Sequence, residues 1–321
     1  MTENKSSQPI TDRGSIAVIT ALSFIPIAIA LAVLVDSGRA WEARHRLQNG
    51  VEVAAAAAAQ SWMSGGGSCS ATSLALVTAD GATAPSISCS VTGTNTNGTV
   101  TVSASSRVPL AFASLIGRDF ANVSASTGVR IGPASSAIGV SPLSLCANNP
   151  DISAWIASGM TSRVTATITF ETATPVCGGT IPGNWGTLDF NGGNNSTTEL
   201  ADWVVNGYEG SLNVGDVIDG NPGAPSTSSN IAAVVGESFI IALYSAPYGS
   251  GSSAKYPIVG FAQVHLVSAN VTATASKRSL TVRFERGITS GSVGDLVGNN
   301  GIGYGVSTWS VCAYDSQGEC S

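Results

Sequence analysis

Charged residues are scarce in this sequence. They make up 11% of its 321 residues, and the formal net charge is −6 at pH 7. No run of lysines and arginines occurs outside the N-terminal helical segment. A nucleic-acid-binding protein needs a basic surface, because it must neutralise phosphate charges. The composition therefore argues against nucleic acid as a partner.

Sequence motifs of known chemistry are also missing. The chain contains no GxSxG, HExxH, P-loop or GxGxxG pattern. It has two histidines, His45 and His265, and the sequence assigns neither of them a partner acid or nucleophile. None of its six cysteines forms a CxxC pair, which disfavours zinc. We therefore predict neither an enzyme nor a bound cofactor or metal.

Two alternatives for ligands and catalysis stay open at this point. Residues 189–195 begin like a calcium loop, but Gly193, Asn194 and Leu200 stand where that loop requires an oxygen ligand, Gly and Glu. A Gly- and Asn-rich turn before the capped helix that begins near Ser196 explains the same residues. A hydrolase would need two carboxylates facing each other in a cleft, and nothing in the sequence selects such a pair.

Long apolar runs are rare as well, with one exception. Ser15–Val35 is a run of 21 residues without a charge. As an α-helix it would be ~31 Å long, close to the ~30 Å of a bilayer's hydrocarbon core. Pro26 lies in mid-span, where a membrane helix tolerates a kink. The alternative is a signal peptide cleaved after Ala30 or Ala32, but the run exceeds the usual ~7–15 apolar residues, so we predict a retained transmembrane helix.

The helical pattern continues from Asp36 to Met63. Glu42 and Arg46 are spaced to pair on a helix surface. Apolar and small residues recur at helical spacing along one side, and this stripe should be covered by the protein's own β domain or by a partner helix. The alanines favour a partner helix, because they let two backbones approach closely; the alternative is an Ala-rich spacer. The residues of the stripe are Leu47, Val51, Ala54, Ala58 and Trp62.

All six cysteines follow the apolar run. Their even number and the absence of a zinc pattern predict disulfides, and disulfides imply an oxidising, exported compartment. This places the N-terminus in the cytoplasm and the body of the protein outside the membrane. The alternative for the middle two cysteines is a pair of buried free thiols. Proximity in the sequence suggests the pairs Cys69–Cys89, Cys146–Cys177 and Cys312–Cys320.

The rest of the chain is rich in Ser, Thr, Ala, Val and Gly, with short alternating runs between turn residues, which is typical of a β-rich exported protein. We predict an α+β fold: a long N-terminal transmembrane helix followed by β-rich extracytoplasmic domains. The expected parts are a disordered N-terminal segment over 1–12, a helix over 13–63, a small β-containing domain over 64–135 and a larger β-rich domain over 136–321. Strands are expected at 99–104, 123–131, 164–170, 238–244, 257–267 and 280–285, and short helices near 111–116, 196–206 and 228–235.

Three short motifs follow one another in the N-terminal segment. They are RGSIAV at 13–18, VDSGR at 35–39 and RLQN at 46–49, the last of which runs into the alanines at 54–59. In order and spacing they resemble the N-terminal segment of TadE/TadG-like proteins of the Flp, or tight-adherence, pilus machinery. The region from Gly183 to Ala262 is similar to the C-terminal region of some TadG-related proteins.

The resemblance implies a pilin-like single-pass protein of the inner membrane or the pilus, with an exported C-terminal domain and no enzyme activity. Its partners would be the membrane and other pilus-assembly proteins or pilin helices. Gly14 and Ser15 are the implied processing site, although the fifth residue after that cut is Ile19, where substrates of the prepilin peptidase have Glu. The Asp-x-Ser-x-Ser metal pattern of some TadG-type proteins does not occur.

We therefore expect a pilus-assembly or minor-pilin-like protein that displays its β domain outside the membrane for protein docking or adhesion. The alternative is a membrane-tethered module that binds a glycan or another surface ligand. A connected aromatic surface built from Trp155, Trp185, Trp203 or Trp309 would favour it, although core packing is the commoner use of such residues.

Overall fold

The computed structural model describes residues 13–66, 69–79, 85–161, 163–169, 177, 187–192, 197–221, 228–250, 253–271, 279–294 and 303–312. The disorder expected for residues 1–12 lies outside these ranges. The fold is α+β, with one long helix followed by strand-rich structure, as the composition predicted. The chain forms two compact units, and each is described by itself. The first comprises Met1–Ala55, Ser70–Cys89 and Val102–Thr127, and the second Ala56–Cys69, Ser90–Thr101 and Gly128–Ser321.

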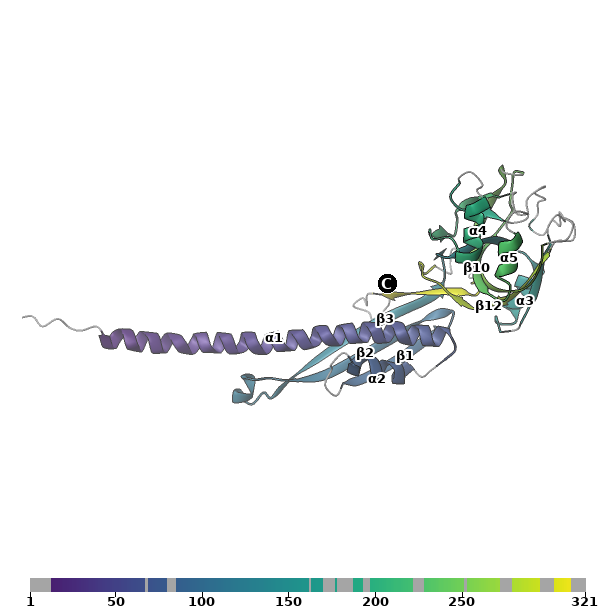
Figure 1. Cartoon of the computed structure of the whole chain (residues 1–321). Coiled ribbons are helices and arrows are strands. Elements are labelled where there is room, and N and C mark those ends of the chain that lie inside the picture. Colours follow the sequence, from purple (N-terminus) through teal and green to yellow (C-terminus); the bar gives the residue numbers. More distant parts are fainter. Residues whose placement is uncertain are drawn as a thin grey trace, which may run out of the picture. The chain divides into compact units, whose positions relative to one another are not determined.

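The first helix, α1, runs without interruption from Arg13 to Met63, the range that the sequence predicted (Figure 1). Pro26 lies inside it and does not end it. The helix stops at Gly65, whose φ of 76° is left-handed, a conformation that glycine adopts at low cost. The amides of Ser64 and Gly66 donate to the carbonyls of Gln60 and Ser61, which would otherwise have no intrahelical partner.

A five-stranded sheet follows the long helix in the order β1-β2-β3-β14-β13. The strand β2 alternates as the sequence predicted, with Val100, Val102 and Ala104 buried. A short 3₁₀ helix, η1 (Ala113–Ile116), lies between β2 and β3, where a short helix was expected. The helix α2 (Cys69–Ala79) was not predicted. The strands are β1 (Ser86–Thr94), β2 (Asn97–Pro109), β3 (Phe120–Pro133), β13 (Gly287–Ile288) and β14 (Val306–Cys312).

The division between the two units falls inside β3. The part of β3 that belongs to the second unit pairs antiparallel with β14, from Pro133 opposite Ser307 to Gly128 opposite Cys312. The strand β13 then adds in parallel to β14. Residues close to the end of the sequence therefore complete a sheet that begins soon after α1.

The second unit contains the main sheet, whose path is β5-β10-β11-β12-β6. The pairings are antiparallel except for β5 with β10, which is parallel. The strand β9 adds to β11, and β7 adds to β9. The strands are β5 (Val140–Cys146), β6 (Thr165–Thr169), β7 (Leu188–Asp189), β9 (Val217–Gly220), β10 (Ser238–Tyr244), β11 (Lys255–Asn270) and β12 (Ser279–Glu285), and a separate pair is β4 (Ser136–Ala137) with β8 (Leu212–Asn213).

Both faces of this sheet are covered. Successive side chains of a strand point to opposite faces. Ile241 and Leu243 of β10 lie in one apolar cluster, while Ala242 lies in another. The first cluster also contains residues of α3 (Pro150–Ala157) and α5 (Ser228–Ala233), and the second contains Leu200 and Trp203 of α4 (Thr197–Asn206).

Candidate functional site

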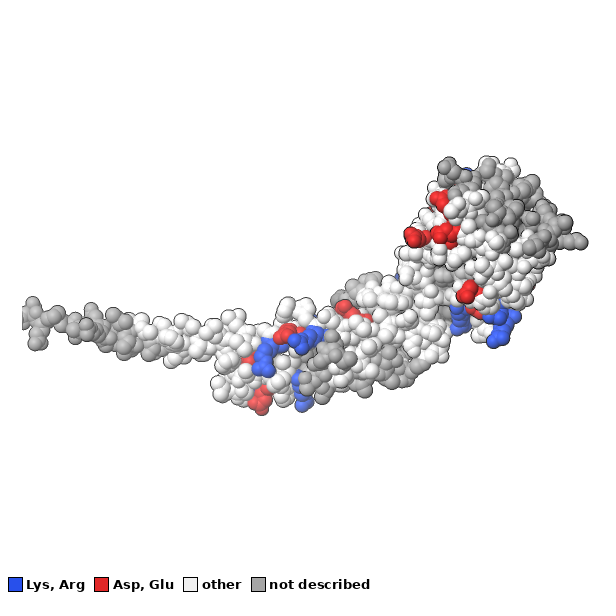
Figure 2. All heavy atoms as spheres, viewed as in Figure 1, with Lys and Arg blue, Asp and Glu red and all other residues white. Residues whose placement is uncertain are grey.

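The N-terminal half of α1 exposes its apolar side chains. Leu31 is 57% exposed, and other large apolar residues from Ile19 to Val35 are exposed to a similar degree. Figure 2 shows this stretch as an unbroken white surface that ends at the first charged side chains. Among the described residues one helix is long and apolar enough to cross a membrane, and it is α1. An exposed apolar surface of this size is unfavourable in water and needs lipid or other apolar helices around it.

The first charged residue after this stretch, Asp36, is fixed by the backbone of a loop far away in the sequence. Its Oδ1 accepts a hydrogen bond from the amide of Ala111 at 2.7 Å, and its Oδ2 accepts from Phe112 at 3.1 Å and from Ala113 at 2.7 Å. The side chain is 7% exposed. Hydrogen bonds to an ionised acceptor are stronger than those between neutral groups. The carboxylate therefore ties the loop between β2 and β3 to the end of the apolar stretch.

We call this loop, residues 110–120, the exit loop. It is closed by the amide of Leu110, which donates to the carbonyl of Asp119 at 3.0 Å. Its 3₁₀ helix η1 ends at Gly117, whose φ is 81°. Four large apolar side chains of the loop are exposed: Phe112, Leu115, Ile116 and Phe120. The guanidinium of Arg107 lies 4.7 Å from the centre of the Phe120 ring, at cation–π distance.

Three turns beyond Asp36, α1 is held by a second polar contact. The amide nitrogen of Gln48 donates to the carboxylate of Glu52 at 2.7 Å and to the hydroxyl of Thr127 in β3 at 3.0 Å. On the exposed side, Trp41 packs edge-on against His45, with ring centres 4.1 Å apart. Arg46 forms the expected pair with Glu42 at 2.5 Å. His45 therefore lies in a surface aromatic contact.

The predicted stripe of α1 is covered by the chain itself. Leu47, Val51, Ala54 and Ala58 are at most 1% exposed, and Trp62 is half-buried. Of the two covers expected for this stripe, the burial of these residues favours the chain's own structure over a partner helix. The ring of Trp62 packs closely on Gly98. A Cβ atom added to Gly98 would lie 2.8 Å from the Trp62 ring, which is too close for any residue with a side chain.

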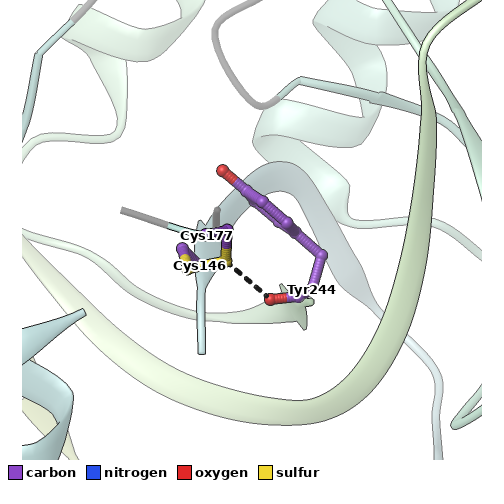
Figure 3. The surroundings of a disulfide bond; sticks show 3 residues. All are labelled: Cys146, Cys177 and Tyr244. Atoms are coloured by element: carbon purple, nitrogen blue, oxygen red, sulfur yellow. Dashed lines mark hydrogen bonds between the residues drawn. A yellow bond between two sulfur atoms is a disulfide. The ribbon is translucent and has the colours of Figure 1, made fainter. Parts of the chain in front are cut away.

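The disulfide between Cys146 and Cys177 joins the end of β5 to a residue 31 positions later (Figure 3). Sequence proximity suggested this pair. The Sγ atom of Cys177 lies 3.5 Å from the carbonyl oxygen of Tyr244, and since a disulfide sulfur carries no hydrogen, this is a packing contact. Burial raises the pKa of the Tyr244 hydroxyl. Cys69, Cys89 and Cys312 are also disulfide-bonded, while Cys320 lies outside the described residues.

The second histidine has polar neighbours that the sequence did not reveal. Ser238 Oγ lies 3.1 Å from His265 Nδ1 and donates to Glu285 at 2.9 Å. Burial raises the pKa of Glu285, but hydrogen bonds from Arg283 and Ser238 outweigh it and hold that pKa below its usual value. In a catalytic triad the histidine lies between the serine and the acid, whereas here the serine lies between the other two. The cluster ties β10, β11 and β12 together and does not activate a nucleophile.

The described tryptophans of the aromatic surface considered for a glycan lie in different surroundings. Trp155 is buried in the core, where its ring stacks on Phe284 with centres 5.4 Å apart. Trp203 packs on Phe190 and Tyr208. Trp309 is half-buried in β14, and Trp185 lies outside the described residues. The expectation of a connected patch is wrong for Trp155, because it fills the core below the sheet.

The second unit contains a cavity of about 600 Å³. It lies between the end of α4, the residues after α5 and the start of β10, and Trp203, Glu237 and Gln263 are among its lining residues. Ser141 also lines it, and the buried hydroxyl of this residue has no hydrogen-bond partner. Within the described residues, no three His, Cys, Asp or Glu side chains come together as a metal site, and residues 193–196 of the loop considered for calcium lie outside them.

These features define a class: a protein with one candidate membrane helix at its N-terminus and a disulfide-bonded, strand-rich body. Residues 14–61 match the family model described as "Putative Flp pilus-assembly TadE/G-like". The match spans the exposed apolar stretch, Asp36 and most of the buried stripe, and it confirms the resemblance for these residues. No curated protein and no solved structure matches the chain. The family match and the helix together fit a single-pass membrane protein connected with pilus assembly.

Proposed function

We propose that this chain is an inner-membrane pilus-assembly or minor-pilin-like protein of a Flp-type pilus, with its β-rich body outside the membrane. The observation that carries the proposal is the coincidence of two findings on one segment. The residues that match the pilus-assembly family include those whose apolar side chains stand exposed on α1. A helix with this surface is suited to a bilayer or to the packed helices of a pilus.

The outward orientation is supported by the disulfides. Structural disulfides form and persist in oxidising compartments, and the cysteine pair Cys146–Cys177 lies in the second unit. Non-reducing peptide mapping of the protein from membranes should recover this linked pair. Alkylation of all six thiols without a reductant would contradict the exported orientation.

Deletion and complementation test the function itself. Pili should be lost on deletion and restored by the full chain. A chain in which a cleavable signal peptide replaces residues 1–35 should export the body without restoring pili, because the apolar surface of α1 is missing. Pili formed by that truncated chain would contradict the proposal. Mass spectrometry of the mature N-terminus tests the candidate cut between Gly14 and Ser15, both of which lie in α1.

The cavity beside α4 favours a second function, that of a membrane-tethered module for a surface ligand. A buried hydroxyl without a hydrogen-bond partner, such as that of Ser141, is unfavourable unless another molecule supplies the partner. A ligand screen on the full chain and on Ser141→Val, which replaces the hydroxyl by methyl groups, separates the two functions. Binding that is lost in Ser141→Val while pili still form would assign the cavity to a ligand.

A further inference from the structure

We propose that the exit loop is a second membrane contact, which places its apolar side chains in the interfacial layer of the bilayer where α1 leaves it. This inference rests on the proposed membrane function. It concerns the first unit alone, since α1 up to Ala55 and the whole of the exit loop belong to that unit. The occupant of the loop surface would be lipid, and not a second protein.

The position of the loop along α1 is the first argument. Val35 is the last residue of the uncharged run, and Asp36 is the next residue. The hydrogen bonds of Asp36 to the amides of residues 111–113 hold the loop at this level of the helix. If the uncharged run fills the hydrocarbon core, the loop lies at its boundary.

The surface of the loop is the second argument. Leu115 is 84% exposed and Ile116 is 80% exposed, although they are neighbouring aliphatic residues at the tip of a hairpin. At this exposure neither side chain is part of a buried apolar core. Adjacent aliphatic side chains in such a position gain free energy when lipid covers them.

The surroundings of the loop are the third argument. Trp41 lies five positions after Asp36 on α1 and is 66% exposed, and tryptophan is enriched where membrane helices enter the headgroup layer. Arg118 follows Ile116 by two positions, and Arg107 lies over the Phe120 ring. Arginine side chains can reach lipid phosphates while their stems stay on apolar surface. These residues lie at the end of the only helix among the described residues that could cross a membrane, which favours lipid as their partner.

Spin labelling of the full chain in nanodiscs of phosphatidylcholine and phosphatidylglycerol at a ratio of 3:1 tests the inference. Since the described cysteines are disulfide-bonded, the label is attached through a keto amino acid at position 115. The control label stands at position 105, an exposed serine position of β2 on the same hairpin. A third label, at position 27, reports whether α1 itself is in lipid.

The readout is the collision rate of the spin label with oxygen, which concentrates in lipid, and with a nickel chelate, which stays in water. The ratio of the oxygen rate to the nickel rate is compared between positions. The ratio at position 115 should exceed that at position 105 by about threefold or more, as expected for a side chain below the headgroups. Equal ratios at 115 and 105, with lipid contact at 27, would overturn the inference and leave the membrane span intact. Low collision rates with both reagents at 115 would show a covering protein and overturn it as well. Absence of lipid contact at 27 would instead contradict the proposed function.

Asp36→Asn in the labelled chain tests the connection between helix and loop. The amide group cannot accept three hydrogen bonds as the carboxylate does, so the ratio at 115 should fall toward that at 105 while the ratio at 27 stays unchanged. Glu42→Gln, a neighbouring exposed carboxylate on the same helix, is the matched control and should leave all three ratios as they are. An unchanged ratio at 115 in Asp36→Asn would show that Asp36 does not position the loop.

Discussion

The two halves of α1 both contain large apolar residues, but these residues have opposite surroundings. Leu31 in the first half is 57% exposed, whereas Leu47 in the second is 1% exposed. Val35 and Val51 differ in the same way. The first half is apolar on all sides and has no cover from its own chain, while the second half is apolar along one stripe and is covered. The distribution of apolar residues around a helix therefore indicates whether the helix is covered on one side or on all sides.

Filling the buried stripe should have the largest effect. Ala54→Leu combined with Ala58→Leu adds volume where both alanines are buried, and overpacking costs about 1–3 kcal/mol per site. Both residue types favour helices, so helix propensity is not the cause. We expect loss of protease resistance and a lower unfolding temperature in detergent.

The control is the same change in the exposed half, Ala28→Leu with Ala30→Leu, which should leave the unfolding temperature unchanged. A stripe mutant as stable as the unaltered protein would show that the second half of α1 is not packed against its own chain.

A charge in the first half should act on membrane insertion instead of folding. Ile27→Arg places a cation in the middle of the uncharged run and should disfavour insertion by about 2.5–3.5 kcal/mol. The fraction of protein that remains in membranes after alkaline carbonate extraction should fall. Ile27→Leu is the control. Normal membrane retention of Ile27→Arg would mean that this half is not surrounded by lipid.

Asp36 lies at the junction of the two halves. Its replacement by asparagine should lower the stability by less than the changes above and by more than the loss of a surface ion pair. Asp36→Asn loses the charge and the fit to three amides, so the unfolding temperature in detergent should fall by about 2–8 °C. Hydrogen exchange should increase at the amides of Ala111 to Ala113 in particular. Unaltered exchange at these amides would show that other contacts hold the exit loop.

The surface pair of the second half should contribute least. Glu42 and Arg46 are both 60% exposed, and such pairs contribute about 0.3–0.5 kcal/mol on a helix. Glu42→Gln should therefore change the unfolding temperature by no more than the error of the measurement. A large effect would indicate that the carboxylate has a role beyond its pair with Arg46.

The sequence predicted those elements whose signals are local. The bounds of α1, the strand β10 and the start of α5 agree with the expectations, because apolar periodicity and turn residues mark them. The helix α3 was missed, although Asn149 caps it by accepting from the amide of Asp151 and Pro150 opens it. That signal was present in the sequence. The helix α2 has no comparable signal, since its residues CSATSLALVTA suit a strand equally well.

The candidate site depends on contacts that no single segment reveals. Asp36 and its partners are separated by 75 to 77 residues, and nothing in the residues around position 111 marks them as donors to a carboxylate. The sequence likewise predicted the stripe of α1 but not what covers it, since amphipathic spacing shows that a face is buried without showing which partner buries it. The disulfide Cys146–Cys177 could be predicted from the sequence, because its two cysteines are only 31 positions apart.

The pairing of β3 with β14 has a consequence for export of the body, if the body lies outside the membrane as proposed. If α1 enters the membrane first and the chain follows it outward, β3 emerges early, but its partner strand arrives only about 170 residues later. Until then the edge of β3 carries unpaired amides and carbonyls, which can pair with any other strand nearby. An exported body should therefore need a periplasmic chaperone to protect this edge of β3 until β14 has been released and can pair with it. Truncation before Val306 should accordingly favour aggregation outside the membrane even though α1 and the exit loop are intact.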